Sequence, residues 1–158
     1  MEELKKEQSK PSSFRLQQTI EACLQKFRLD EKHKNVSLHL IDDLVAPLSI
    51  RGEEKTLAKI LDLIFFNAIA VINATKVNIY LKQLLTTHNE VLLEFTVEDN
   101  GTKNFIDSNE FAVAYKNNLQ EIKKEIESFG GKTEISSLEG VGTTIKFLFP
   151  YIVLGIRV

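Results

Sequence analysis

The sequence predicts an α+β fold, a two-layer α/β sandwich in which helices cover one face of a mixed, mostly antiparallel sheet. Three segments repeat apolar residues at helical spacing, and two pairs of segments alternate apolar and polar residues with the period of a strand. The helical and strand-like segments lie in separate blocks along the chain. Separate blocks of this kind are typical of α+β domains.

Composition limits the function classes that are open to the chain. With 158 residues and 43% hydrophobic content, it can form one core without disulfides or structural metal. The 20 basic and 22 acidic side chains leave a net charge of -2, so no overall field attracts nucleic acid. The single cysteine, Cys23, forms neither an internal disulfide nor a zinc cluster. No segment reaches the roughly twenty apolar residues of a membrane span, so we expect a cytoplasmic domain without membrane insertion.

The N-terminal third is predicted to contain one helix and two short strands. Residues 1–13 (MEELKKEQSKPSS) are charged and end in proline and serines, which indicates a leader or the remnant of an upstream helix. The domain is expected over residues 14–150. Residues 14–29 carry one apolar stripe and predict an amphipathic helix. Residues 36–40 alternate and predict a strand, with residues 48–50 as a short partner strand.

The central helix is expected over residues 53–73, where a continuous apolar stripe indicates burial. The negative charges of Glu53 and Glu54 interact favourably with the positive N-terminal end of such a helix. A third helix is expected over residues 115–129 and should end at the Gly130-Gly131 pair. The further expected elements are a hairpin of residues 77–81 and 91–97, a polar loop over 100–112, and a hairpin of 132–137 and 143–149.

The tail, residues 151–158, is apolar and rich in β-branched residues, so we expect an extra strand. We expect it to fold back onto its own domain. The alternative is that it forms a contact with another chain, because an apolar strand on a sheet edge invites association.

Asp99 is the most informative polar residue. It follows the alternating segment 91–97 on the same inward row, and a carboxylate aimed at a core needs a hydrogen-bond donor from the protein or a ligand. The alternative is that Asp99-Asn100-Gly101 forms only a turn, which those residue types favour.

Two further features could border a ligand. Asn67 lies at the edge of the apolar stripe of the central helix, where an amide lines a rim or bonds a neighbouring loop. Residues 140–144 (GVGTT) contain glycines that allow the backbone to approach a ligand closely. A tight hairpin turn explains the same glycines.

Four segments in order resemble the motifs of the ATP-binding domain of sensor histidine kinases, in the histidine kinase-like ATPase (GHKL) family. The segments ILDLIFFNA (60–68), VEDNG (97–101), IESFGG (126–131) and SLEGVGTTIKFLFP (137–150) are similar to the N box, the first glycine box, the end of the post-lid helix and the last glycine box. The resemblance covers residues 14–150 and implies the Bergerat-type sandwich of that family, with ATP and Mg²⁺ as cofactors.

The resemblance also implies a set of nucleotide-binding residues. Asn67 matches the asparagine that ligates Mg²⁺, and Asp99 matches the aspartate that accepts a hydrogen bond from the adenine amino group. Gly101 matches the glycine that lets the base lie against the strand end. The last glycine box adds Gly140, Gly142 and Thr143, of which Thr143 matches the threonine near the adenine.

Several positions depart from the family pattern, mainly where the triphosphate would lie. Leu63 replaces a polar residue one turn before Asn67, Ala70 replaces a basic residue, and Lys103 replaces a glycine. Residues 116–119 (KNNL) replace the glycine-rich GLGL whose backbone N–H groups cradle the phosphates.

The resemblance implies an ATP-binding catalytic domain of a two-component sensor kinase, which transfers phosphate to a histidine of a separate dimerisation/phosphoacceptor domain that signals to a response regulator. His33, His39 and His88 are expected to have structural or solvated roles, and no catalytic residue is assigned to the chain itself. The alternative is a degenerate, non-catalytic protein-docking module with weak or no nucleotide binding, which the altered 116–119 segment favours.

Overall fold

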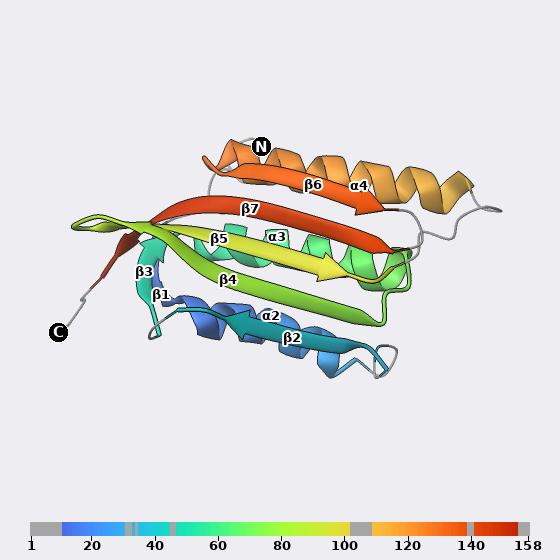
Figure 1. Ribbon diagram of the computed structural model, residues 1–158, viewed down its shortest axis with the longest axis horizontal. Helices are drawn as coiled ribbons and strands as arrows, with labels where there is room; N and C mark the ends of the chain where they lie inside the picture. Colours follow the sequence, from blue (N-terminus) through green and yellow to red (C-terminus); the bar gives the residue numbers. More distant parts are fainter. Residues whose placement is uncertain are drawn as a thin grey trace, which may run out of the picture.

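The computed structural model describes residues 11–30, 33, 35–44, 47–101, 109–138 and 141–154. In these ranges the helices lie on one face of a seven-stranded sheet, as Figure 1 shows. The α+β class and the two-layer arrangement predicted from the sequence are therefore confirmed.

The sheet is mixed and mostly antiparallel. The only parallel pair among the described strands joins β2 to β4. The spatial order is β1-β3-β7-β5-β4-β2, and β6 pairs with β7 beside this path. The strands are β1 (Ser12–Arg15), β2 (Ser37–Asp42), β3 (Ser49–Gly52), β4 (Lys76–Thr86), β5 (Glu90–Asp99), β6 (Lys132–Leu138) and β7 (Gly142–Val153).

Both predicted hairpins are confirmed, since β4 pairs with β5 and β6 pairs with β7. The expectation that residues 48–50 partner the strand at 36–40 is wrong. β2 instead buries Leu38 opposite Val77 of β4, whereas Ile50 of β3 lies opposite Phe14 of β1 and Val153 of β7. The two short strands β2 and β3 therefore lie near opposite edges of the sheet, and each buries its apolar residue there.

The helices are α2 (Leu16–Arg28), α3 (Glu54–Phe66) and α4 (Asn109–Ser128). A π-helical turn, η2 (Asn67–Val71), continues α3, so the long central helix predicted over 53–73 is confirmed. The expected loop over 100–112 is too long at its C-terminal end, because α4 already begins at Asn109. Glu110 in its first turn interacts favourably with the positive end of the helix dipole. In the described ranges no helix is long and apolar enough to cross a membrane.

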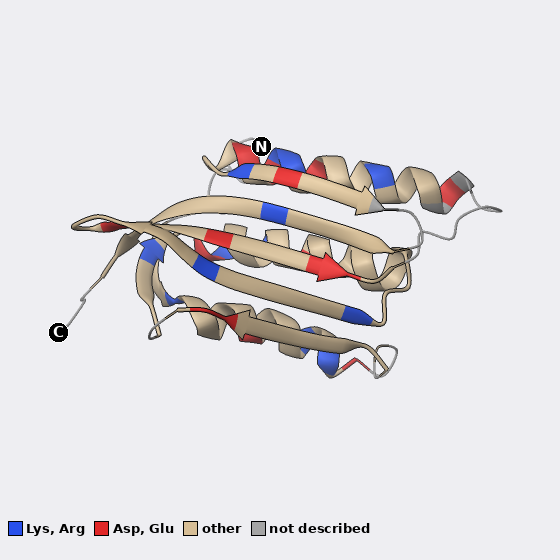
Figure 2. Cartoon of the chain, in the orientation of Figure 1, with Lys and Arg blue, Asp and Glu red and all other residues tan. Residues whose placement is uncertain are grey.

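The core lies between the helices and the sheet. Ile60 and Ile64 of α3 are buried in the same core cluster as the alternate residues Leu93, Phe95 and Val97 of β5. The Phe95 ring stacks on Phe147 of β7 at a centroid distance of 4.7 Å. The opposite face of the sheet carries charges of both signs, and Figure 2 shows them dispersed over several strands.

The sheet continues on both sides of residues 14–150. Ser12 and Ser13 belong to β1, and β7 runs through Pro150 to Val153. Tyr151 is buried and pairs with Val91 of β5. Residues 155–158 of the expected tail lie outside the described residues.

Candidate functional site

The candidate site lies where β5 ends and β7 begins, beside η2 and α4. The antiparallel register pairs Asp99 of β5 with Thr143 of β7, and Gly142 precedes Thr143. Gly101 follows β5 and contacts Ile72 at the end of η2. The structure thus brings Asp99, Gly101, Gly142 and Thr143 together. Gly140 lies outside the described residues.

Asp99 forms the turn that the sequence offered as the alternative interpretation. Its Oδ1 accepts a hydrogen bond of 2.8 Å from the backbone N–H of Gly101. The carboxylate is half-buried, and its charge adds a small contribution to the rise in the pKa of Tyr115 that burial mainly causes. The side chain therefore fixes the end of β5 and also contributes negative charge to the site.

The two described glycines of the site are required by contacts within the protein. A Cβ on Gly142, at a φ of +149°, would lie 1.9 Å from the carbonyl oxygen of Asp99. A Cβ on Gly101 would lie 2.5 Å from the side chain of Ile72. These glycines let η2 and β7 pack directly on the end of β5.

Tyr115 of α4 fills the space between η2 and the start of β7. Its hydroxyl lies 2.6 Å from Oγ1 of Thr143, and both side chains are buried. The ring packs against Val71 and Ile72, with Leu119 beside them. Burial raises the pKa of the Tyr115 phenol, and the hydrogen bond to Thr143 opposes that rise.

Asn67, the residue matched to a magnesium ligand, is 2% exposed and already has a protein partner. Its Oδ1 accepts a hydrogen bond of 3.0 Å from Nδ2 of Asn118 on α4. The oxygen that could ligate a cation is therefore engaged with the protein. Within the described ranges, no group of three or more His, Cys, Asp or Glu side chains could hold a metal ion.

Residues 116–119 lie inside α4, whose first residue is seven positions before Lys116. Backbone N–H groups in a helix interior donate to the carbonyl four residues earlier, and only the first four N–H groups of a helix are free. The N–H groups of this segment are thus engaged in the helix. They do not form the open helix start that binds phosphate.

The other departures are placed as follows. Leu63 is half-buried and lines a groove between α2 and α3, and Ala70 is exposed on η2. Lys103 lies outside the described residues. Of the histidines, His33 lies on the Phe27 ring and His39 pairs with Ser37 of its own strand.

Sequence reasoning missed the roles of two α4 residues. The helical pattern predicts Tyr115 only as an apolar residue of the stripe, although its hydroxyl forms a hydrogen bond with Thr143. The resemblance treats Asn118 only as a residue that replaces a glycine, although its amide donates a hydrogen bond to Asn67. A signal was present in both cases, because a buried hydroxyl or amide needs a hydrogen-bond partner.

Two comparisons with known proteins gave no match, neither among protein-family models nor among curated protein sequences. Solved structures do match. The catalytic domain of the histidine kinase ThkA, in a nucleotide-free form, superposes with a TM-score of 0.67 at 19% identity, over 89% of this chain and 95% of that chain.

Two further structures agree with ThkA. The mycobacterial sensor histidine kinase MprB gives a TM-score of 0.62 at 14% identity, over 90% of this chain and 99% of that chain. The cytoplasmic segment of the histidine kinase QseC gives a TM-score of 0.58 at 13% identity, over 87% of this chain and 76% of that chain. The structure therefore matches histidine kinase catalytic domains over about 90% of the chain, and identities this low establish the fold alone.

Proposed function

With the fold of histidine kinase catalytic domains as the premise, we propose that this domain is a non-catalytic protein-docking module that binds Mg-ATP weakly or not at all. The observation that carries this proposal is the unbroken course of α4 through residues 116–119, with Tyr115 bonded to Thr143. Both features belong to the region where nucleotide would have to enter.

Nucleotide binding would have to displace Tyr115 first. Removing a buried aromatic ring from its contacts costs about 1.5–3 kcal/mol, and its hydrogen bond adds about 0.5–1.5 kcal/mol. Because each 1.4 kcal/mol is about a factor of ten in affinity, these two costs together weaken binding by roughly one and a half to three orders of magnitude. Unwinding the start of α4 would add to that cost.

The metal end of the site supports the same proposal. Binding Mg²⁺ at Asn67 would break the hydrogen bond from Asn118 inside a buried region. The amide of Asn118 would then be left without its partner, at a cost of about 1–3 kcal/mol. Leu63, one turn earlier, offers no second polar group.

A second function is favoured by one observation, the adjacency of Asp99, Gly101, Gly142 and Thr143. In this version the domain binds adenine nucleotide through the base and, with Mg²⁺ at Asn67, supplies ATP for phosphoryl transfer to a histidine on a separate cytoplasmic domain. It requires Tyr115 to leave the space between η2 and β7.

A titration with a fluorescent ATP analogue, with and without Mg²⁺, separates the two functions. The docking function predicts that the wild-type domain shows no binding, or weak binding that Mg²⁺ does not strengthen. Tyr115→Ala, checked for folding by circular dichroism, should then gain binding that does not depend on Mg²⁺. Saturable wild-type binding that strengthens with Mg²⁺ and is displaced by ATP would establish the second function instead.

A further inference from the structure

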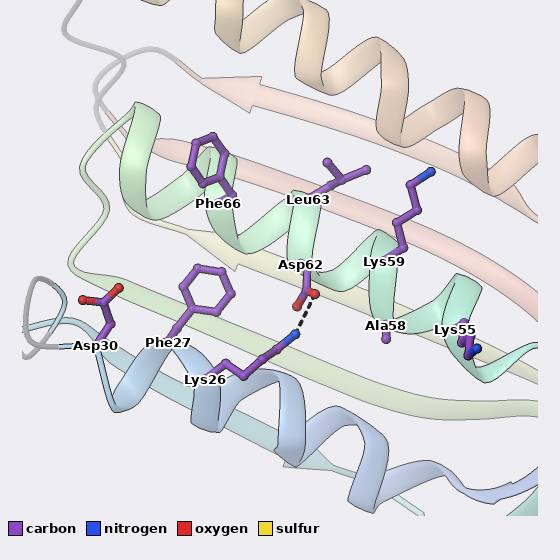
Figure 3. Close-up of a pocket in the computed structure, with 9 residues that line it drawn as sticks. All are labelled: Lys26, Phe27, Asp30, Lys55, Ala58, Lys59, Asp62, Leu63 and Phe66. Atoms are coloured by element: carbon purple, nitrogen blue, oxygen red, sulfur yellow. Dashed lines mark hydrogen bonds and ion pairs between the residues drawn. The ribbon is translucent and has the colours of Figure 1, made fainter. Parts of the chain in front are cut away.

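A groove between α2 and α3 lies outside the nucleotide-like site. It has a volume of about 600 Å³, and Figure 3 shows its lining side chains on the two helices. Phe27 comes from α2, whereas Ala58, Leu63 and Phe66 come from α3. The charged lining residues are Lys26, Asp30, Lys55, Lys59 and Asp62. We call this the α2–α3 groove.

The apolar residues of the α2–α3 groove are open to solvent. Phe66 is 51% exposed although it belongs to the central helix of the layer, and Phe27 and Leu63 are half-buried. In a soluble domain, grouped apolar side chains with a charged rim mark a surface for interaction with another protein.

The groove is held in shape by contacts on both sides of α3. Lys26 of α2 forms an ion pair of 2.7 Å with Asp62 of α3, shown as the dashed line in Figure 3. Lys59 of α3 pairs with Glu125 of α4 at 3.1 Å. A surface already formed before binding avoids much of the ordering cost that weakens association.

Two further charged residues of the lining, Lys55 and Asp30, lie at opposite ends of the groove. Within the described part of the chain Lys55 is exposed and makes no ion pair, and it lies at the start of α3. Asp30 follows α2 at the other end, 3.7 Å from Nδ1 of His33. A helix dipole fits this pattern when its negative C-terminus lies near Lys55 and its positive N-terminus near Asp30.

We propose that the α2–α3 groove binds an amphipathic helix of a partner protein, antiparallel to α3, with apolar residues on one face and acidic residues in its last turn. The groove runs from Lys55 to Phe66, which are eleven positions and about 16 Å of helix apart, and this length matches about three turns of a partner. Apolar side chains at positions i, i+4 and i+7 would then lie along the groove from Phe66, past Leu63, to Ala58. The inference rests on the proposed docking function and names the partner's chemistry.

The test uses a fluorescein-labelled peptide of about four turns with leucines on one face and glutamates in its last turn. The matched control peptide has the same composition with the leucines distributed around the helix. Fluorescence anisotropy should show saturable binding of the amphipathic peptide and at least tenfold weaker binding of the control. Equal binding of the two peptides, or no saturable binding of either, would overturn the proposal.

Two substitutions locate the binding. Phe66→Glu should weaken binding at least tenfold, whereas Val113→Glu should leave it unchanged because Val113 is similarly exposed, at 56%, on α4 away from the groove. Lys55→Glu should reverse the preference in favour of a peptide with lysines in its last turn. Equal losses from Phe66→Glu and Val113→Glu would overturn the proposal.

Two other segments could occupy the groove, and each would give a distinct experimental result that overturns the proposal. If residues 1–10 cover the groove, the peptide binds only after they are deleted. If a second copy covers it, sedimentation shows a wild-type dimer that Phe66→Glu converts to a monomer. If neither the peptide nor Mg-ATP binds, the groove proposal alone is removed. If ATP binds and Mg²⁺ strengthens that binding, the proposed function is removed whatever the peptide does.

Discussion

The hydroxyl of Tyr115 lies 2.6 Å from the hydroxyl of Thr143, and this contact joins the early part of α4 to the first residues of β7. The two residues are 28 positions apart in sequence and both are buried. The contact fixes α4 over the end of β5, and Tyr115 fills the space between η2 and the start of β7.

Replacing Tyr115 by phenylalanine should lower the free energy of unfolding by about 1 kcal/mol, because the buried Thr143 hydroxyl loses its partner. Chemical denaturation measures this change. Tyr80→Phe is the matched control, since Tyr80 is half-buried and no hydrogen bond of its hydroxyl is found within the described residues. It should stay within about 0.5 kcal/mol of the wild type. Equal effects of the two substitutions would mean that the Tyr115 contact contributes nothing specific.

Gly142→Ala should destabilise the domain by more than about 3 kcal/mol, because the added Cβ would meet the Asp99 carbonyl oxygen at 1.9 Å. Gly130→Ala provides a comparison at a glycine with a φ of +86° and no atom within 4 Å of the added Cβ. There the backbone conformation alone should cost about 1–2 kcal/mol. Denaturation midpoints that rank the two substitutions in the opposite order would contradict the close packing of β7 on β5.

Truncation after Pro150 should lower the melting temperature by roughly 5–10 °C without changing the oligomeric state, because buried Tyr151 and the pairing of Val153 with Ile50 are lost. A truncation after Leu154 keeps these contacts and is the control. Calorimetry and light scattering measure the two quantities. A dimer that becomes a monomer with an unchanged melting temperature would show that the tail is an assembly strand.

Cys23 should react slowly with a thiol reagent in the native domain and rapidly after denaturation. It is 2% exposed, and burial, with a smaller effect of the Asp62 charge, raises the pKa of its thiol from 9.0 to about 11. Since the folded state favours the neutral thiol, its contribution to stability is complete below pH 9 and is lost between pH 9 and 11. Cys23→Ala should therefore lose less stability than the wild type over that range, and parallel pH profiles would contradict the shift.

Local patterns predicted the strands and helices because each buries one face. The alternation at 91–97 became β5, with Leu93, Phe95 and Val97 buried, and the stripe at 53–73 became α3 and η2. The pairing of β2 with β4 could not be predicted in this way, since it joins strands separated by the whole of α3. Alternation fixes which face of a strand is buried and leaves its neighbours open.

The start of α4 and the contacts of the candidate site also could not be predicted from the sequence. Polar residues near Asn109 have the composition of a loop, yet they are compatible with the exposed side of a helix. The hydrogen bond between Asn118 and Asn67 spans 51 positions, so the partner of either amide depends on how the helices pack. Sequence reasoning therefore identified residues 116–119 as a departure from the family pattern without showing that Asn118 bonds Asn67.

Amide hydrogen exchange at Lys116, Asn117 and Asn118, followed by NMR with and without millimolar Mg-ATP, tests the central claim most directly. If these N–H groups belong to the interior of α4, they should exchange slowly, as we also expect for buried Ile122 of the same helix, and Mg-ATP should change neither their rates nor their chemical shifts. Fast exchange of the three amides that becomes slow on addition of Mg-ATP would show a segment that opens and binds phosphate, and would contradict the account of a closed nucleotide site.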